Sequence, residues 1–324
     1  MTYNFCTLFD SNYLPKGLAL YQSLIDLELD FQLFVLAFDD KCYEILNDLK
    51  LKNLVVISLK EFESPELLAV KPTRTRAEYC WTSTASLISF CISKFSLNEC
   101  TYVDADLMFY HSPKLAFDEL KDSDIAITEH IPNGPDKIEG KYCVQFNYFR
   151  NSEEGIKALN WWRDKCLEWC YGRYEDNKFG DQKYLESFPL IFKNVKIVEN
   201  RGVGVAPWNI HLYDFGEFGK IKHNGKTQDI IFFHYHGTKI QLENQKLSVY
   251  LKDSDTNPDL DKNIYIPYLK LLARVYKMYL NQEVTKFEVV NRSFLSKKYA
   301  QIKLLFRHNP IAKFIYYDVF KVKV

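Results

Sequence analysis

The protein has 324 residues, of which 47% are hydrophobic and 26% are charged. This composition is typical of a globular protein and excludes a mostly disordered chain, and the length suits one large domain with a smaller appendage. The formal net charge is zero, but residues 261–324 contain 13 Lys and Arg against 4 Asp and Glu. We therefore expect a basic C-terminal segment.

The eight cysteines lie in apolar sequence, without CxxC pairs or the density of a disulfide scaffold. We expect reduced thiols in a cytoplasmic protein. The N-terminus has no basic region and becomes polar too early for a signal peptide. No stretch is long and apolar enough to span a bilayer, so neither secretion nor a transmembrane anchor is expected.

Short apolar runs alternate with longer segments of helical periodicity. We expect strands at residues 3–9, 31–38, 54–59, 101–110, 125–128, 144–149, 195–198 and 230–234. We expect helices at residues 17–29, 41–49, 79–95, 153–169 and 181–186. This order predicts an α/β fold with a mostly parallel, Rossmann-like sheet covered by helices on both faces. A polar break at residues 253–259 indicates a boundary near residue 250, between an α/β domain at 1–250 and a basic, mostly helical extension at 251–324.

Two acidic residues, Asp104 and Asp106, interrupt the strand expected at residues 101–110. Acids in the middle of a buried strand usually mark a site. Their i, i+2 spacing puts both carboxylates on the same side of an extended segment. Such oxygens suit Mn²⁺ or Mg²⁺, and the cation can bridge the phosphates of a nucleotide diphosphate. Asp-x-Asp alone is common in surface turns, but the apolar residues on both sides make this one more specific.

Around this motif the sequence resembles the nucleotide-sugar transferases of the GT-A fold, in particular glycosyltransferase family 8. The resemblance rests on the strand and polar turn at residues 3–13, Tyr-Val-Asp-Ala-Asp at 102–106, Gly-Asp-Gln-Lys-Tyr-Leu at 180–185 and Phe-His-Tyr-His-Gly at 233–237. It therefore covers roughly residues 3–240, and it implies a GT-A domain at 1–250.

The resemblance also implies a third protein ligand for the cation. His234 takes this role beside Asp104 and Asp106, and an imidazole next to two carboxylates suits Mn²⁺. His236 would face the same way on a strand, so it is the alternative ligand. A structural histidine pair at a strand end is the competing interpretation.

Asp181 and Gln182 resemble the Asp-Gln pair that lies near the sugar and the acceptor in the family. A carboxylate there can bind sugar hydroxyls or accept the proton of the acceptor, and the Gln amide can lie under the anomeric carbon. Gly-Asp-Gln is also a good helix start, so an N-cap role for Asp181 is the alternative.

Four positions are candidates for binding the nucleotide. Asp10 ends the first expected strand, where open α/β sheets bind ligands, and can hydrogen-bond uracil or ribose. Arg74 and Arg76 lie in a basic loop before a helix and suit phosphate, although solvated surface arginines are equally expected. Lys239 corresponds to the diphosphate lysine of the family, in Thr-Lys-Ile where the family has Lys-Pro-Trp.

Three positions are candidates for binding sugars. The segment at residues 140–150 looks like the Asn-containing strand that contacts the donor sugar in the family. Cys143 occupies the usual place of that Asn, so Asn147 or Gln145 would supply the amide. Trp208 is a candidate for stacking on an acceptor ring, with a packed loop as the alternative.

Residues 293–324 combine seven Lys and Arg with apolar residues at helix-like intervals. A basic amphipathic helix indicates binding to a membrane surface, here the cytoplasmic face of the inner membrane. A helix packed on the catalytic domain is the alternative. Nucleic-acid binding is not expected, because no nucleic-acid motif accompanies the charge.

We therefore expect a metal-dependent transferase that moves a sugar from a UDP-sugar to a saccharide or lipid-linked saccharide, in surface polysaccharide or lipopolysaccharide synthesis. The resemblance favours retention of anomeric configuration, and an inverting mechanism with Asp181 as base stays open. One alternative is a sugar-1-phosphate nucleotidyltransferase, but the Gly-rich basic loop that it needs does not follow the first strand. Another is a non-catalytic saccharide-binding or assembly subunit with the same fold.

Overall fold

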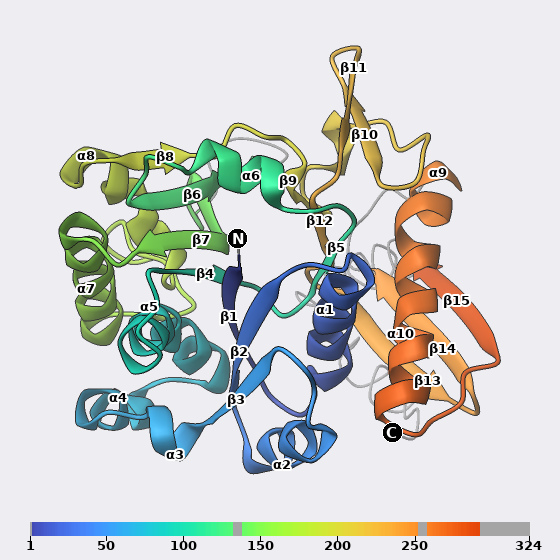
Figure 1. Ribbon diagram of the computed structural model, residues 1–324, viewed down its shortest axis with the longest axis horizontal. Helices are drawn as coiled ribbons and strands as arrows, with labels where there is room; N and C mark the ends of the chain where they lie inside the picture. The colour runs from blue at the N-terminus through green and yellow to red at the C-terminus, as the bar shows by residue number, and fades with distance from the viewer. Residues whose placement is uncertain (1, 132–137, 252–257, 292–324) are drawn as a thin grey trace, which may run out of the picture.

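A computed structural model describes residues 2–131, 138–251 and 258–291 of the chain. Its centre is a seven-stranded sheet with the order β3-β2-β1-β4-β7-β6-β8 (Figure 1). The strands are β1 (Tyr3–Phe9), β2 (Phe31–Ala37), β3 (Leu54–Ser58), β4 (Glu99–Val103), β6 (Ile125–Glu129), β7 (Tyr142–Arg150) and β8 (Val195–Ile197). They coincide with expected strands to within a few residues, and the α/β fold is confirmed.

The direction of the strands changes in the middle of this sheet. Strands β3, β2, β1 and β4 are parallel, whereas β7 is antiparallel to both β4 and β6, and β8 is parallel to β6. Strand order reverses between β1 and β4, and the carboxyl ends of parallel strands at such a point are where open α/β sheets bind ligands. The fold therefore predicts a ligand-binding site at the carboxyl ends of β1 and β4.

Helices cover both faces of the sheet, and each face has its own apolar core. One core contains buried residues of α1 (Leu14–Asp26), α2 (Asp40–Leu49) and α10 (Ile266–Tyr279). The other contains those of α3 (Leu59–Phe62), α4 (Pro65–Val70), α5 (Arg76–Lys94), α7 (Glu153–Glu168) and α8 (Phe188–Ile191). The short helix α6 (Lys114–Glu119) packs with the first core.

The helix expected at residues 79–95 begins three residues earlier, at Arg76, because its N-terminus has a capping box. The Thr75 side chain accepts a hydrogen bond from the Glu78 amide, and the Glu78 carboxylate accepts one from the Thr75 amide at 2.7 Å. These two bonds satisfy donors that a helix start otherwise leaves unpaired.

The strand expected at residues 101–110 is two strands. Strand β4 ends at Val103, the chain turns at residues 104–106, and β5 (Leu107–Phe109) follows. Strand β5 belongs to a three-stranded sheet with β12 (Phe232–His234) and β9 (Val203–Val205), in the order β5-β12-β9. An uninterrupted strand would have carried both acids into the core, where unpaired carboxylates are costly.

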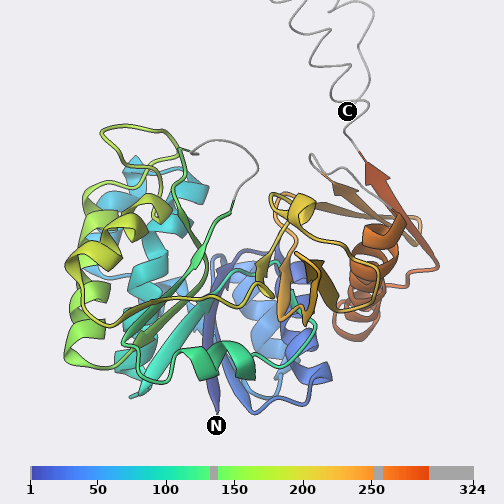
Figure 2. The ribbon, with the colours of Figure 1, turned by 90° about the horizontal axis from the view of Figure 1, so that it is seen from above.

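The described elements between residues 239 and 291 lie together at one side of the molecule, where α10 packs against α1 (Figure 2). It has the strands β13 (Lys239–Glu243), β14 (Lys246–Leu251) and β15 (Lys286–Asn291), and the helices α9 (Pro258–Leu260), η4 (Asp261–Tyr265) and α10. Strand β15, which follows the expected domain boundary near residue 250, pairs in parallel with β14, which lies at that boundary. The boundary stays a prediction. The basic segment at 293–324 lies outside the described residues.

The remaining elements are short. They are a hairpin of β10 (Lys220–His223) and β11 (Lys226–Asp229), and the 3₁₀ turns η1 (Lys71–Thr73), η2 (Gln182–Ser187) and η3 (Ile210–Leu212). In the part of the chain that the structure describes, every helix is too short or too polar to cross a membrane. All eight cysteines are free thiols, as expected.

Candidate functional site

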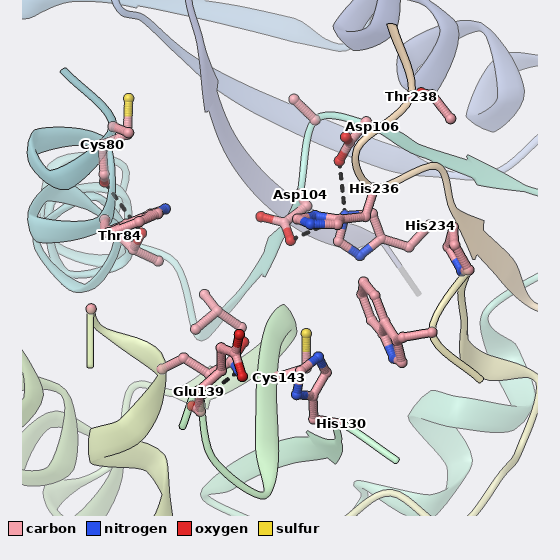
Figure 3. Close-up of a pocket in the computed structure, with 18 of the residues that line it drawn as sticks. Cys80, Thr84, Asp104, Asp106, His130, Glu139, Cys143, His234, His236 and Thr238 are labelled. Atoms are coloured by element: carbon pink, nitrogen blue, oxygen red, sulfur yellow. Dashed lines mark hydrogen bonds and ion pairs between the residues drawn. The ribbon is translucent and has the colours of Figure 1, made fainter. Parts of the chain in front are cut away.

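A cavity of about 1160 Å³ opens at the carboxyl ends of β1 and β4. This volume is in the range of small-molecule sites, which are typically a few hundred to about 1,000 Å³. Polar groups from distant parts of the chain line it, and they include Asp10, Arg76, Asp104, Asp106, Asp181, Gln182 and His234. Figure 3 shows Asp104, Asp106 and His234 side by side in this cavity. The cavity therefore contains most of the residues that the sequence singled out.

Strand pairing brings His234 to the two acids. Strand β12 runs antiparallel to β5 with His234 opposite Leu107, and the Tyr235 amide donates to the Asp106 carbonyl at 2.9 Å. The Nε2 atom of His234 lies 2.9 Å from Asp106 Oδ1 and 3.6 Å from Asp104 Oδ2 (Figure 3). The expected set of two carboxylates and one imidazole is thus assembled at one point.

A second hydrogen bond fixes the orientation of the His234 ring. Its Nδ1 atom lies 2.9 Å from the Gln145 side-chain oxygen, and both residues are buried. Because an amide oxygen only accepts, Nδ1 carries a proton and Nε2 faces the carboxylates. Outer hydrogen bonds of this kind orient histidine ligands of metals. The oxygen and nitrogen donors and this support fit Mn²⁺ or Mg²⁺.

The two acids differ in their electrostatic surroundings. Burial alone would raise the pKa of Asp106, but the Lys16 ammonium and the His234 ring outweigh it and hold the pKa of that carboxyl well below its usual range. Burial dominates at Asp104 and raises its pKa, with the negative charge of Asp106 acting in the same direction. Asp106 is therefore the more strongly ionised of the two.

His236 lies on the cavity wall beside Trp208, with ring centroids 5.4 Å apart. The ion pairs with both aspartates are made by His234. Of the two histidines, His234 is thus the one whose ring nitrogen meets both carboxylates.

Asp181 lies in the cavity wall and is almost completely buried. Its side chain does not cap η2, so the N-cap alternative is wrong. The Oδ2 atom has no hydrogen-bond partner among the described residues, and burial raises the pKa of this carboxyl to about 7, with the charge of Asp104 adding to the rise. Gln182 also lines the cavity and donates to the Glu139 carbonyl at 3.2 Å.

The guanidinium of Arg76 is paired with carboxylates. Its Nε atom lies 2.8 Å from Asp10 Oδ2, and Nη2 lies 2.9 Å from Asp39 Oδ2. Asp10 also accepts hydrogen bonds from the amides of Asn12 and Tyr13. Both Asp10 and Arg76 line the cavity, and two of the three guanidinium nitrogens of Arg76 are paired with carboxylates.

Two other candidates for binding the nucleotide lie elsewhere. Arg74 stacks over the Tyr171 ring at 3.9 Å and donates to the Leu167 carbonyl, and it lines a neighbouring depression rather than this cavity. Lys239 is exposed at the start of β13 and does not line the cavity, where its neighbour Thr238 does.

The structure does not bring the two candidates for binding the donor sugar to the cavity. Gln145 and Asn147 are fully buried in β7, where Gln145 holds His234 and the Asn147 amide donates to the Val144 carbonyl. Neither side chain is among the residues that line the cavity, whereas Cys143 and Val144 of the same strand are. Trp208 does line it, with its ring against His234 at a centroid distance of 5.1 Å.

Sequence reasoning missed three residues of this region. Lys16 reaches Asp106 from α1, and Trp81 and Phe179 form an aromatic wall beside Asp181, with centroids 6.4 Å apart. A signal for Lys16 was present, since it is the one basic residue in helix α1, whose first turn is otherwise apolar. Trp81 and Phe179 had no such signal, because aromatic residues are frequent along the whole chain.

Three sulfur atoms form a separate buried group. Cys6, Cys91 and Cys100 lie within 4.8 Å of one another, enclosed by the apolar core under α5. A metal bound there by three thiolates would leave net charge in an apolar surrounding, which is strongly unfavourable. Packing of neutral thiols accounts for the group.

Comparison with known proteins identifies relatives of the chain. It is 31% identical over 258 residues to the uncharacterized protein YfnF of Bacillus subtilis (strain 168), covering 76% of this chain and 84% of YfnF. It is 31% identical over 282 residues to the uncharacterized protein YfnD of the same strain, covering 84% of this chain and 89% of YfnD. No protein-family model matches the sequence.

Solved structures with the same fold are glycosyltransferases. The galactosyltransferase LgtC, in complex with donor and acceptor sugar analogues, matches with a TM-score of 0.54 at 13% identity, covering 85% of this chain and 96% of LgtC. The bifunctional glycosyltransferase WbbM matches with a TM-score of 0.52 at 12% identity, covering 86% of this chain and 52% of WbbM. The expected GT-A fold is confirmed.

Proposed function

We propose that the chain, which belongs to the same protein family as YfnF and YfnD, is a metal-dependent glycosyltransferase, because it has the GT-A fold. It moves a sugar from a UDP-sugar to a saccharide acceptor. The observation that carries this proposal is the meeting of Asp104, Asp106 and His234 in one cavity, from segments about 130 positions apart in the sequence.

The proposed cation site consists of Asp104, Asp106 and His234. Mn²⁺ or Mg²⁺ held there supplies Lewis-acid stabilisation of the charge that develops on the departing diphosphate. We propose that Asp10, which lines the cavity at the end of β1, binds the nucleoside, and that its ion pair with Arg76 keeps the carboxylate oriented. The diphosphate then lies between the nucleoside end of the cavity and the cation site.

Asp181 is the proposed group for binding or deprotonating a sugar hydroxyl. Asp181 lies in the cavity wall, and its Oδ2 atom has no hydrogen-bond partner among the described residues. With a pKa of about 7, the ionised and the protonated forms of its carboxyl group are both well populated near neutral pH. Trp81 and Phe179 offer an apolar surface next to it, on which the face of a sugar ring can stack. We propose this part of the cavity as the place where donor sugar and acceptor meet.

The acceptor that we propose is a growing surface polysaccharide or lipopolysaccharide, and transfer with retention is the favoured stereochemistry. LgtC, which shares the fold, binds donor and acceptor sugar analogues. This supports a nucleotide-sugar donor and a saccharide acceptor here.

Titration calorimetry with UDP tests the proposal. We expect UDP to bind only with Mn²⁺ or Mg²⁺, and we expect Asp106→Ala and His234→Ala to lose this binding. His236→Ala and Asp164→Ala, a carboxylate exposed on α7, are the controls and should retain it. Equal loss in His236→Ala would contradict the ligand assignment.

Each alternative function predicts a different result in binding and activity assays. Saccharide binding without any need for metal, and no binding of UDP, would indicate a non-catalytic subunit. Formation of a nucleotide sugar from UTP and a sugar 1-phosphate would indicate a nucleotidyltransferase. Slow hydrolysis of UDP-Glc, UDP-Gal, UDP-GlcNAc or UDP-GalNAc, screened one by one, identifies the donor.

A further inference from the structure

Lys16 is a buried lysine next to the proposed cation site. It lies in the first turn of α1, and only 5% of its surface is exposed. Its ammonium lies 3.4 Å from Asp106 Oδ2 and 4.3 Å from the centre of the Tyr13 ring. Burying an ammonium is unfavourable unless a negative group compensates it, so this position implies a specific electrostatic role.

The two oxygens of Asp106 have different partners. Oδ1 lies 2.9 Å from His234 Nε2, on the side where Asp104 is also found, whereas Oδ2 is the oxygen that faces Lys16. Lys16 itself does not line the cavity. The Lys16 ammonium therefore interacts with Oδ2 of Asp106 without entering the cavity, and it leaves Oδ1 directed toward His234.

This arrangement changes the charge that a cation meets. Two carboxylates alone carry two negative charges, but with the Lys16 ammonium beside Asp106 the group carries a net charge of −1 when His234 is neutral. Coulomb repulsion between an ammonium and a divalent cation is large at such short range in a buried site. A bare cation would therefore be bound more weakly than by the same carboxylates without the lysine, and the negative charge of a nucleotide diphosphate would strengthen its binding.

We infer that Lys16 is a positioning residue that holds Asp106 in place before the cation arrives and weakens the site for a cation without nucleotide, so that cation and nucleoside diphosphate bind cooperatively. This inference rests on the proposed function, because it presupposes the cation site. Lys16 is not one of the proposed ligands of the cation. Removal of its charge should raise the affinity for Mn²⁺, which can be measured.

Titration of Mn²⁺ without nucleotide, followed by electron paramagnetic resonance of the free ion, tests the inference. We expect Lys16→Met to bind Mn²⁺ about tenfold more tightly than the wild type, because one repelling charge is removed. The variant should melt at a lower temperature without metal and gain more from added Mn²⁺. The factor by which UDP improves Mn²⁺ binding should shrink.

Three further variants separate charge from structure. Lys16→Arg keeps the charge and should bind Mn²⁺ like the wild type, and Lys16→Gln replaces Lys16→Met if the latter does not fold. Lys183→Met is the matched control, since Lys183 is a largely buried lysine paired with Glu186 at 2.9 Å outside this cavity. It should leave Mn²⁺ affinity unchanged.

The outcomes distinguish this inference from the proposed function. If the wild type binds Mn²⁺ and neutral variants at position 16 bind it equally or more weakly, the role of Lys16 is overturned and the cation site stands. If the wild type binds no Mn²⁺ with or without UDP, the cation site is overturned, and the role of Lys16 with it.

Discussion

The carboxyl groups of Asp106 and Asp181 lie in one cavity but have different properties, because each has different neighbours. Asp106 faces the Lys16 ammonium and the His234 ring, which outweigh its burial and keep its pKa low. Asp181 is also buried, but no cation among the described residues compensates it, and its pKa rises to about 7. Environments that separate the pKa values of neighbouring acids assign them different tasks. Asp106 suits a cation, and Asp181 suits exchange of a proton or a hydrogen bond with a sugar hydroxyl.

Replacement of Asp181 by Asn tests this difference through stability. An unfolded Asp ionises near pH 4, whereas folded Asp181 keeps its proton up to about pH 7, so the folded protein loses stability as pH rises through this window. We expect Asp181→Asn to remove this loss and to be about 2–4 kcal/mol more stable than the wild type at pH 8. Urea denaturation at pH 4 and pH 8 measures the effect.

The exposed acid Asp164 provides the comparison for that measurement, and Asp164→Asn should change stability equally at both pH values. If the difference in unfolding free energy between the wild type and Asp181→Asn is the same at pH 4 and pH 8, burial does not raise the pKa of Asp181. In activity assays, the wild-type rate should change through about pH 7, and the Asp181→Asn profile should lack this step.

The elements that carry the site meet through close packing as well as strand pairing. Helix α1 follows β1 after a short turn, and Gly17 in α1 lies directly against the Phe9 ring at the end of β1. A side chain at position 17 would place its Cβ atom 2.3 Å from that ring. This close approach positions the first turn of α1, and with it Lys16, next to Asp106.

Gly17→Ala should therefore destabilise the protein, although alanine is the better helix former. The helix propensity of alanine would favour the variant by roughly 1 kcal/mol. Overpacking against Phe9 opposes it by about 1–3 kcal/mol, so we expect a net loss of up to about 2 kcal/mol in the free energy of unfolding. Urea denaturation measures the loss. Gly216→Ala, where a Cβ atom meets nothing within 4 Å, should be nearly neutral, and a gain in Gly17→Ala would show that α1 moves freely.

At the scale of the whole molecule, the segment after the expected boundary contributes to the same body. Helix α10 packs against α1, and Arg274 pairs with Asp26 across this contact. Tyr265, at the end of η4, lines the cavity together with residues of the α/β domain. The chain up to residue 291 is therefore expected to be needed for a complete cavity.

Truncation after residue 291 separates this part from the basic tail. We expect the shortened chain to bind Mn²⁺ and UDP like the full chain, because the cavity residues are all retained. We expect it to lose binding to vesicles that contain anionic lipids, since the tail supplies the basic residues of the expected amphipathic helix. Co-sedimentation with anionic and neutral vesicles measures this binding. Equal sedimentation of both chains with anionic vesicles would contradict a membrane role of the tail.

Local sequence patterns determined the main elements and the identity of the central acids and histidine. The apolar runs of β1, β2 and β3 and the acids at the end of β4 are visible in short windows, because strand burial and motif spacing are local properties. The resemblance to known motifs then connected Asp104 and Asp106 with His234 across the chain.

Only the tertiary structure decided what surrounds those residues. The partner of His234 on Nδ1 is Gln145, and the partner of Asp106 on Oδ2 is Lys16, at sequence separations of 89 and 90 positions. Such contacts depend on which strands pair and how closely a helix packs, and no short window of sequence contains that information. For the same reason Arg76 turned out to bind Asp10 and Asp39. The chemistry of the ligands is thus local in the sequence, while their charge and orientation are properties of the folded chain.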